Sequence, residues 1–185
     1  MRLFLAIELP QSVKDHLAAV QAMLAPHLGT ASLTRDQAMH VTLKFLGEAD
    51  PSQLDPIRES LAAVAGGPVE LSASHVECFP ERGPVRILAA GFGGDVKRLK
   101  ALHAAVEQRS VYLGFRGEDR PYRAHVTLAR ARPVLPPATR KLVIDLTAPA
   151  WPGPTFVAEQ FVLFQSRLTP QGSQYTKLHE FPLKS

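Results

Sequence analysis

Two histidines of this chain stand in identical tetrapeptides. His40-Val41-Thr42-Leu43 recurs 85 residues later as His125-Val126-Thr127-Leu128, in a chain with only seven histidines. Both copies lie in stretches with the composition of β-strands. Alternate side chains of a strand share a face, so the histidine and threonine of each copy would point one way and the valine and leucine into a core. If the chain is an internal duplication, both imidazoles and both hydroxyls would face one cleft.

This set of side chains suits phosphoryl chemistry that needs no metal. One neutral imidazole can accept a proton from attacking water, and one imidazolium can donate a proton to a leaving alkoxide. Threonine hydroxyls can donate hydrogen bonds to the non-bridging phosphate oxygens. We therefore expect His40 and His125 to be catalytic and Thr42 and Thr127 to bind phosphate. Because the two motifs are identical, the residues alone do not decide which histidine is the acid.

Other kinds of site fit the sequence less well. Zinc would need a third or fourth ligand, and no carboxylate lies within either tetrapeptide. No G-x-S-x-G elbow is present for a serine hydrolase. Arg130 is a candidate phosphate ligand, but strict alternation puts it opposite His125, so it reaches the phosphate only if the strand bends or ends there. Lys44 shares the His40 face by the same rule, and we expect it to be a solvated surface lysine.

The flanking sequence predicts an α+β protein. Apolar residues at spacings of three and four predict helices over 11–28, 51–64 and 93–108. Strand patterns cover 2–9, 39–46 (closed by Gly47), 69–76, 84–90, 122–130, 155–165 and 173–181, with a loop at 78–83 and a turn at 169–172. Segment 133–146 is ambiguous between a short helix and irregular structure. The elements show no strict βαβ rhythm and no Gly-rich phosphate loop, which favours largely antiparallel sheet over a Rossmann fold.

Composition limits the class of protein. The 185 residues are 45% hydrophobic and 21% charged, as in folded globular proteins, and the net charge of +4 mildly favours anionic partners. A single cysteine, Cys78, excludes an intrachain disulfide and favours a reducing cytoplasm. The apolar run near the N-terminus is too short for a signal peptide, and no stretch is long enough for a membrane helix. With no coiled coil or long apolar edge in the sequence, we expect a monomer.

The residues around the two motifs resemble the RNA 2′,3′-cyclic phosphodiesterase family, also called 2′-5′ RNA ligase-like proteins, of the two-histidine phosphoesterase superfamily. That superfamily has a pair of H-x-T-x motifs. The resemblance covers essentially the whole chain and includes the segments at 2–7, 40–47, 79–80, 85–88, 125–130, 163–166 and 172–175. Two departures are Ala124, where the family often has proline before the second motif, and Ala89, where it often has tryptophan.

The resemblance implies a bilobal fold for residues 1–185, a single domain with one motif in each lobe. Two pseudosymmetric, mainly antiparallel sheets flanked by helices would enclose the active-site cleft. The implied reaction is hydrolysis of an RNA 2′,3′-cyclic phosphate end to a 2′-phosphomonoester, with no cofactor. A 2′-phosphate product requires protonation of the departing 3′ oxygen, and by analogy His40 is the proton donor and His125 the proton acceptor. Reversible 2′-5′ RNA ligation would be a side activity.

Alternative functions keep parts of this site. The substrate could be a small cyclic nucleotide or an ADP-ribose cyclic phosphate, or the chain could be an RNA-binding module without catalysis. Arg132 and Arg167 are candidate contacts to an RNA backbone. Most aromatic residues are expected to belong to the core, and at most one or two to contact a base, from a set that comprises Phe45, Phe79, Phe164 and Tyr175.

Overall fold

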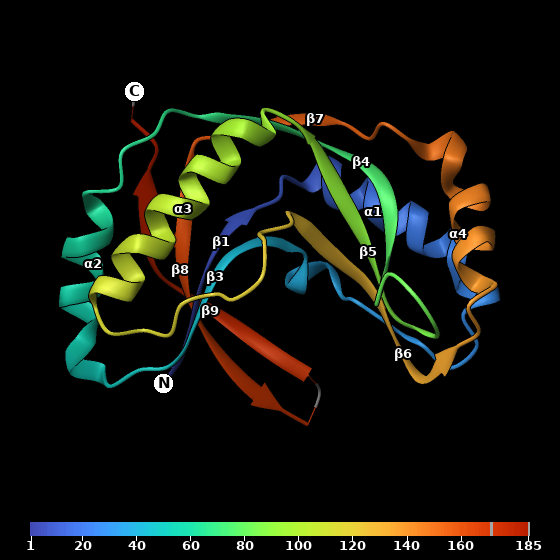
Figure 1. The fold of residues 1–185 in the computed structure, drawn as a ribbon, viewed down its shortest axis with the longest axis horizontal. Helices are drawn as coiled ribbons and strands as arrows, with labels where there is room; N and C mark the ends of the chain where they lie inside the picture. The colour runs from blue at the N-terminus through green and yellow to red at the C-terminus, as the bar shows by residue number, and fades with distance from the viewer. Residues whose placement is uncertain (171, 185) are drawn as a thin grey trace.

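The computed structural model describes residues 1–170 and 172–184. Gln171, part of the predicted turn, lies outside them. The described residues form two antiparallel sheets with α-helices on their outer sides (Figure 1). This arrangement confirms the α+β class with two mainly antiparallel sheets that the sequence predicts.

Both sheets contain one motif strand. The first sheet has the strand order β3 (His40–Glu48), β1 (Arg2–Glu8), β8 (Gln160–Thr169), β9 (Gly172–Pro182). The second has the order β2 (Ser32–Leu33), β6 (His125–Leu135), β5 (Val85–Gly94), β4 (Val69–Phe79), β7 (Thr155–Ala158). The motif strand β3 pairs with β1 as β6 pairs with β5, so the two copies of the tetrapeptide begin equivalent strands.

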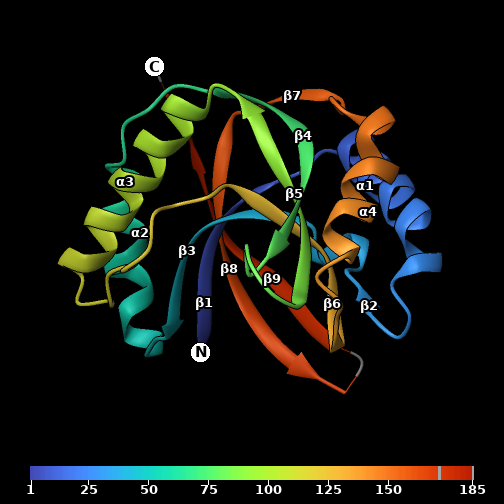
Figure 2. The ribbon, with the colours of Figure 1, turned by 45° about the vertical axis from the view of Figure 1, so that its right-hand side comes forward.

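The helices cross between the two sheets. Helix α1 (Gln11–Leu24) follows β1 of the first sheet but packs with α4 (Thr139–Thr147) beside the second. Helix α3 (Val96–Tyr112) follows β5 of the second sheet but packs on β3 of the first, together with α2 (Leu54–Ala62). Figure 2 shows the two helix pairs on opposite sides of the molecule. None of the described helices is long and apolar enough to cross a membrane.

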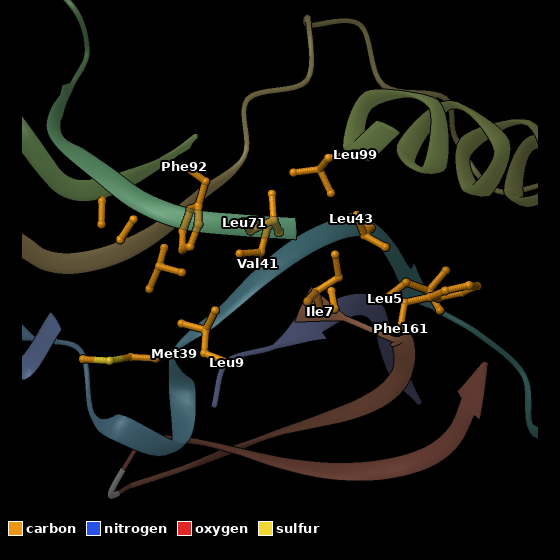
Figure 3. Packing of buried hydrophobic residues seen from close by; sticks show 14 of the residues in the cluster. Leu5, Ile7, Leu9, Met39, Val41, Leu43, Leu71, Phe92, Leu99 and Phe161 are labelled. Carbon is orange, nitrogen blue, oxygen red and sulfur yellow. The ribbon is translucent and has the colours of Figure 1, made fainter. Parts of the chain in front are cut away.

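The core fixes which way each motif strand faces. Val41 and Leu43 of the first motif are almost fully buried, and so are the equivalent Val126 and Leu128. Figure 3 shows Val41 and Leu43 among apolar side chains of both sheets and of α3. Because these side chains are anchored in the core, the histidine and threonine of each motif face the other way, as the alternation predicts.

Each motif strand has an irregularity just after its threonine. Along β1, Ala6 pairs with Thr42 but Leu5 pairs with Lys44, so Leu43 is an extra residue. Along β5, Ala89 pairs with Thr127 but Leu88 pairs with Ala129, so Leu128 is the equivalent extra residue. A β-bulge of this kind reverses the alternation of the side chains that directly follow it. The sixth residue of each motif therefore returns to the face of the histidine.

The bulge shows that the expectation of a solvated Lys44 is wrong. The Lys44 side chain is only 1% exposed and turns toward α3, where its Nζ lies 2.7 Å from Glu107 Oε2. The same Nζ donates a hydrogen bond of 2.6 Å to the Arg116 carbonyl. Burial raises the pKa of the Glu107 carboxyl, but Lys44 and the Glu118 amide outweigh burial and hold that pKa below its usual value. The buried ion pair ties α3 and the segment after it to the first motif strand.

The bulge in β6 is stabilised by a buried glutamine of α1. Gln21 Nε2 donates to the Leu128 carbonyl at 2.7 Å and to the Thr34 carbonyl at 2.8 Å. The amide of Thr34 also donates to the Leu128 carbonyl, at 2.8 Å. The carbonyl of the extra residue is thereby satisfied although it lies off the regular ladder.

Several element boundaries differ from the prediction. The strand expected over 155–165 is two strands, because the chain leaves the second sheet after β7 and enters the first with β8. Cys78, Phe79 and Gly47 lie inside strands, the ambiguous segment contains α4, and the strand expected from residue 122 begins at His125. The first helix ends at Leu24, because Pro26 has no amide proton and a 3₁₀ turn follows. Strand β2, with two residues, is too short to show a period.

Replacing Gln21 with leucine should destabilise the protein by about 1–3 kcal/mol, because one buried and one part-buried carbonyl lose a donor. Urea denaturation measures this change. Gln108→Leu is the matched control on the exposed side of α3 and should change stability by less than about 0.5 kcal/mol. Equal stabilities of the two variants would contradict the role assigned to Gln21.

Candidate active site

One cleft of about 790 Å³ is lined by the five residues that the sequence predicts to be catalytic or to bind phosphate. His40 and Thr42 reach it from β3, and His125, Thr127 and Arg130 reach it from β6. The β8–β9 hairpin, seen below the body of the molecule in Figure 1, supplies a further wall. The fold thus brings together two motifs that lie 85 residues apart in sequence.

His125 is oriented by a backbone carbonyl. Its Nδ1 lies 2.8 Å from the carbonyl oxygen of Arg123. A carbonyl only accepts hydrogen bonds, so Nδ1 carries the proton when the ring is neutral. The lone pair of the neutral imidazole is then on Nε2, which can accept a proton.

His40 lies in an aromatic environment. Its ring centroid is 4.8 Å from that of Phe4 and 5.3 Å from that of Tyr175. Burial, with a smaller contribution from the charge of Lys14, lowers the pKa of His40 to about 4. At this pKa the imidazole is neutral at pH 7. An anion bound against the ring would favour the protonated form and raise the pKa.

The charges around the cleft favour an anionic ligand. Four arginines line it, Arg2, Arg35, Arg130 and Arg132, whereas no Asp or Glu is among its described lining residues. Arginine presents a fork of donors that matches phosphate oxygens. Over the described part of the chain, no group of three or more His, Cys, Asp and Glu side chains is placed to hold a metal ion. The donors of this cleft therefore suit a phosphate group better than a metal.

Arg130 reaches the cleft because of the bulge at Leu128. Strict alternation from His125 would place Arg130 on the opposite face, but the extra residue returns it to the face of Thr127. The equivalent position of the first motif is Phe45, whose side chain is 57% exposed and also lines the cleft. The two halves of the site thus present an aromatic ring and a guanidinium at matching places.

The cross-strand neighbours of both threonines are alanines. Thr42 pairs with Ala6 on β1, and Thr127 pairs with Ala89 on β5; both alanines are fully buried. The departure at Ala89 therefore makes the second lobe match the first. The carbonyl of Thr42 accepts a hydrogen bond of 3.2 Å from the Tyr122 hydroxyl, which connects the segment leading to β6 with the first motif strand.

Some of the other candidates line the cleft and others do not. Phe45, Tyr175 and Arg132 line the cleft, whereas Arg167 and Phe79 are not among its lining residues. Phe164 is buried beneath, stacked on Phe4 at 5.1 Å. Sequence reasoning missed other cleft residues, Arg2, Ser32, Thr34 and Arg35. They carry no motif or periodic pattern that would have marked them.

Comparison with known proteins identifies the family. The model of the family described as LigT like Phosphoesterase matches residues 7–89 and 94–175. The chain is 31% identical to the RNA 2′,3′-cyclic phosphodiesterase of Thermus thermophilus, over 100% of this chain and 91% of that protein. It is 28% identical to the protein of the same name from Methanocaldococcus jannaschii, over 98% of this chain and 100% of that protein.

A solved structure shows the same fold. The crystal structure of TT0787 of Thermus thermophilus matches with a TM-score of 0.74 and 28% identity, over 99% of this chain and 98% of that chain. The family resemblance seen in the sequence is thus confirmed over nearly the whole chain. The chain is a member of the LigT-like phosphoesterase family.

Proposed function

We propose that this chain hydrolyses the 2′,3′-cyclic phosphate at an RNA 3′ end and leaves a 2′-phosphomonoester. The observation that carries the proposal is that two imidazoles, from equivalent ends of β3 and β6, face one arginine-lined cleft. Two histidines in one site can serve as acid and base in the same displacement. The names of the relatives in Thermus thermophilus and Methanocaldococcus jannaschii support the same substrate.

In the proposed mechanism water attacks phosphorus opposite the 3′ oxygen. His125 Nε2 accepts the proton of the water, because its Nδ1 proton is held by the Arg123 carbonyl. The bond between phosphorus and the 3′ oxygen breaks, and His40 gives its proton to that oxygen. The products are a 2′-phosphate and a free 3′ hydroxyl. Thr42, Thr127 and Arg130 donate hydrogen bonds to the non-bridging oxygens, where negative charge develops.

His40 must gain its proton before it can act as the acid. Its pKa of about 4 means that the charged form is scarce at pH 7. The phosphate carries a negative charge and lies against the ring in the complex, which favours the imidazolium. Substrate binding thus supplies the charge that makes His40 a proton donor.

The rest of the proposal follows from the same site. The reaction needs no metal or other cofactor, because the proton transfers use only the two imidazoles. Reversible 2′-5′ ligation would run through the same transition state from a 2′-phosphate donor and is the minor activity in water. A free cyclic nucleotide would fit the phosphate site, but the arginines spread over the cleft favour RNA.

The crossing of α1 and α3 between the sheets supports one domain with an internal repeat. The single cysteine, which is buried and free, fits a cytoplasmic location, and the proposal keeps the expected monomer.

A short RNA with a 2′,3′-cyclic phosphate should be converted to the 2′-phosphate in the presence of EDTA, with a bell-shaped dependence of rate on pH. Phosphorus NMR distinguishes the 2′ from the 3′ product. His40→Ala and His125→Ala should each lower the rate by roughly 10²–10⁴, whereas His27→Ala, at an exposed site outside the cleft, should leave it unchanged.

Each part of the proposal has a result that overturns it. A 3′-phosphate product would reverse the assigned geometry, and cleavage only after metal is restored would exclude the metal-free mechanism. An intact cyclic end under both conditions, with salt-dependent RNA binding, would show a binding module instead. Turnover of free cyclic nucleotides in preference to RNA would change the substrate.

The His40 imidazole should titrate near pH 4 in the free protein and at higher pH when the 2′-phosphate product is bound. The direction follows from burial, which disfavours the imidazolium, and from the anion, which favours it. NMR of the ring nitrogens measures both midpoints. A free-protein midpoint at the ordinary value of 6.5, or no upward shift with product, would contradict this description of His40.

A further inference from the structure

The orientation of His125 depends on a carbonyl outside the sheet. The acceptor of the His125 Nδ1 proton is the carbonyl of Arg123, two residues ahead of β6 in a segment without regular structure. No strand ladder fixes that peptide unit. Whatever fixes Arg123 therefore also fixes the ring that the proposed function uses as the base.

The Arg123 side chain is held by three groups of β4 and the loop after it. Its Nη2 lies 3.1 Å from Glu77 Oε2, and its Nη1 forms an ion pair with Glu81. The guanidinium carbon lies 5.3 Å from the centre of the Phe79 ring, within the range of a cation–π interaction. Phe79 in turn lies 5.5 Å, centroid to centroid, from the ring of His125. The two ends of Arg123, guanidinium and carbonyl, thus join β4 to His125.

Of the two carboxylates that pair with Arg123, Glu77 is the buried one. Its side chain is 12% exposed, and Oε1 lies 2.8 Å from His75 Nε2. Its Oε2 is buried and has no hydrogen-bond partner among the described residues, so the nearby guanidinium of Arg123 supplies the compensating charge. An unpaired buried carboxylate is costly, and this cost holds the guanidinium in place.

The strand between β4 and β6 leaves room for these groups. Gly91 pairs with His75 on one side and with His125 on the other. A Cβ at position 91 would overlap His75 Cε1 and lie 2.6 Å from Glu77 Oε1. The missing side chain is therefore what lets the His75–Glu77 pair lie over β5, beside the second motif.

Helix α4 anchors the loop that carries Glu81. Arg140 donates hydrogen bonds to the carbonyls of Cys78 at 3.0 Å, of Pro80 at 3.0 Å and of Gly83 at 3.2 Å. Three carbonyls bound by one guanidinium restrict the loop on both sides of Glu81. The backbone of the loop that carries Glu81 is thereby held by a second, independent contact to the fold.

We propose that Arg123 is a positioning residue for His125, anchored by Glu77, Glu81 and Phe79, and that it keeps the proton of the neutral imidazole on Nδ1. The inference rests on the proposed function only in naming His125 as the base. Arg123 is not among the residues that line the cleft, so its effect passes through the ring of His125.

Arg123→Ala should lower kcat by about 10- to 100-fold and leave KM unchanged, because the base is misplaced but the substrate contacts remain. Arg123→Lys should recover part of this loss, since one ammonium can pair with Glu77. Arg120→Ala is the matched control: Arg120 is exposed in the same segment and has no ion pair within the described residues, and its loss should leave kcat unchanged.

A second measurement does not depend on activity. In the unliganded protein, at a pH where the ring is neutral, nitrogen NMR should show His125 protonated on Nδ1 in the wild type and a mixture of both tautomers in Arg123→Ala. Glu81→Ala, which removes an exposed partner and spares the core, should give a smaller shift in the same direction. If the wild type lacks phosphodiesterase activity, the proposed function fails while this tautomer test still stands.

Three results would overturn the inference. A raised KM with unchanged kcat would mean that Arg123 binds RNA directly. An unchanged tautomer in Arg123→Ala would mean that the carbonyl is held without the side chain. An equal loss of kcat in Arg120→Ala would mean that any lost charge in this segment has the same effect.

Discussion

One extra residue in each motif strand decides which side chains face the cleft. Without the bulges at Leu43 and Leu128, Arg130 and Phe45 would point into the body of the protein and Lys44 would point out of it. Side chains of two helices stabilise both bulges. Lys44 is neutralised by Glu107 of α3, and the Leu128 carbonyl is bound by Gln21 of α1. In both lobes, the helix that crosses over from the other half supplies the partner.

The two motifs are identical in sequence but differ in their surroundings. His40 lies between aromatic rings, where burial keeps it neutral until an anion arrives. His125 donates from Nδ1 to a carbonyl whose position depends on a charged side chain. The two motif strands thus provide matched geometry, and their neighbours supply the chemical difference that the proposed acid and base require.

Sequence patterns predicted the elements whose residues have a clear period or motif. Both motif strands and the buried valines and leucines followed from alternation, and the antiparallel α+β class followed from the order of elements. The prediction of a solvated Lys44 was wrong because a bulge has no signature in a single sequence. For the same reason, the sequence did not decide whether Arg130 reaches the phosphate. The strand expected over 155–165 was wrong because it crosses from one sheet to the other with no break in apolar composition.

The contacts around the site were beyond sequence reasoning for a different reason. Gln21 and Leu128 are 107 residues apart, and Arg123 and Glu81 are 42 apart. Each of these residue types is ordinary at its own position. Their importance comes from the partner that the fold places beside them, and only the structure shows that partner.

The most direct test of the account uses a 2′,3′-cyclic phosphate whose bridging 3′ oxygen is replaced by sulfur. A thiolate leaves without protonation, so the loss of a general acid should matter little for this substrate. We predict that the defect of His40→Ala largely disappears on the sulfur substrate, whereas the defect of His125→Ala remains. If the His125→Ala defect were the one to disappear, the acid and base would be reversed. If both defects remained, His40 would not protonate the leaving oxygen.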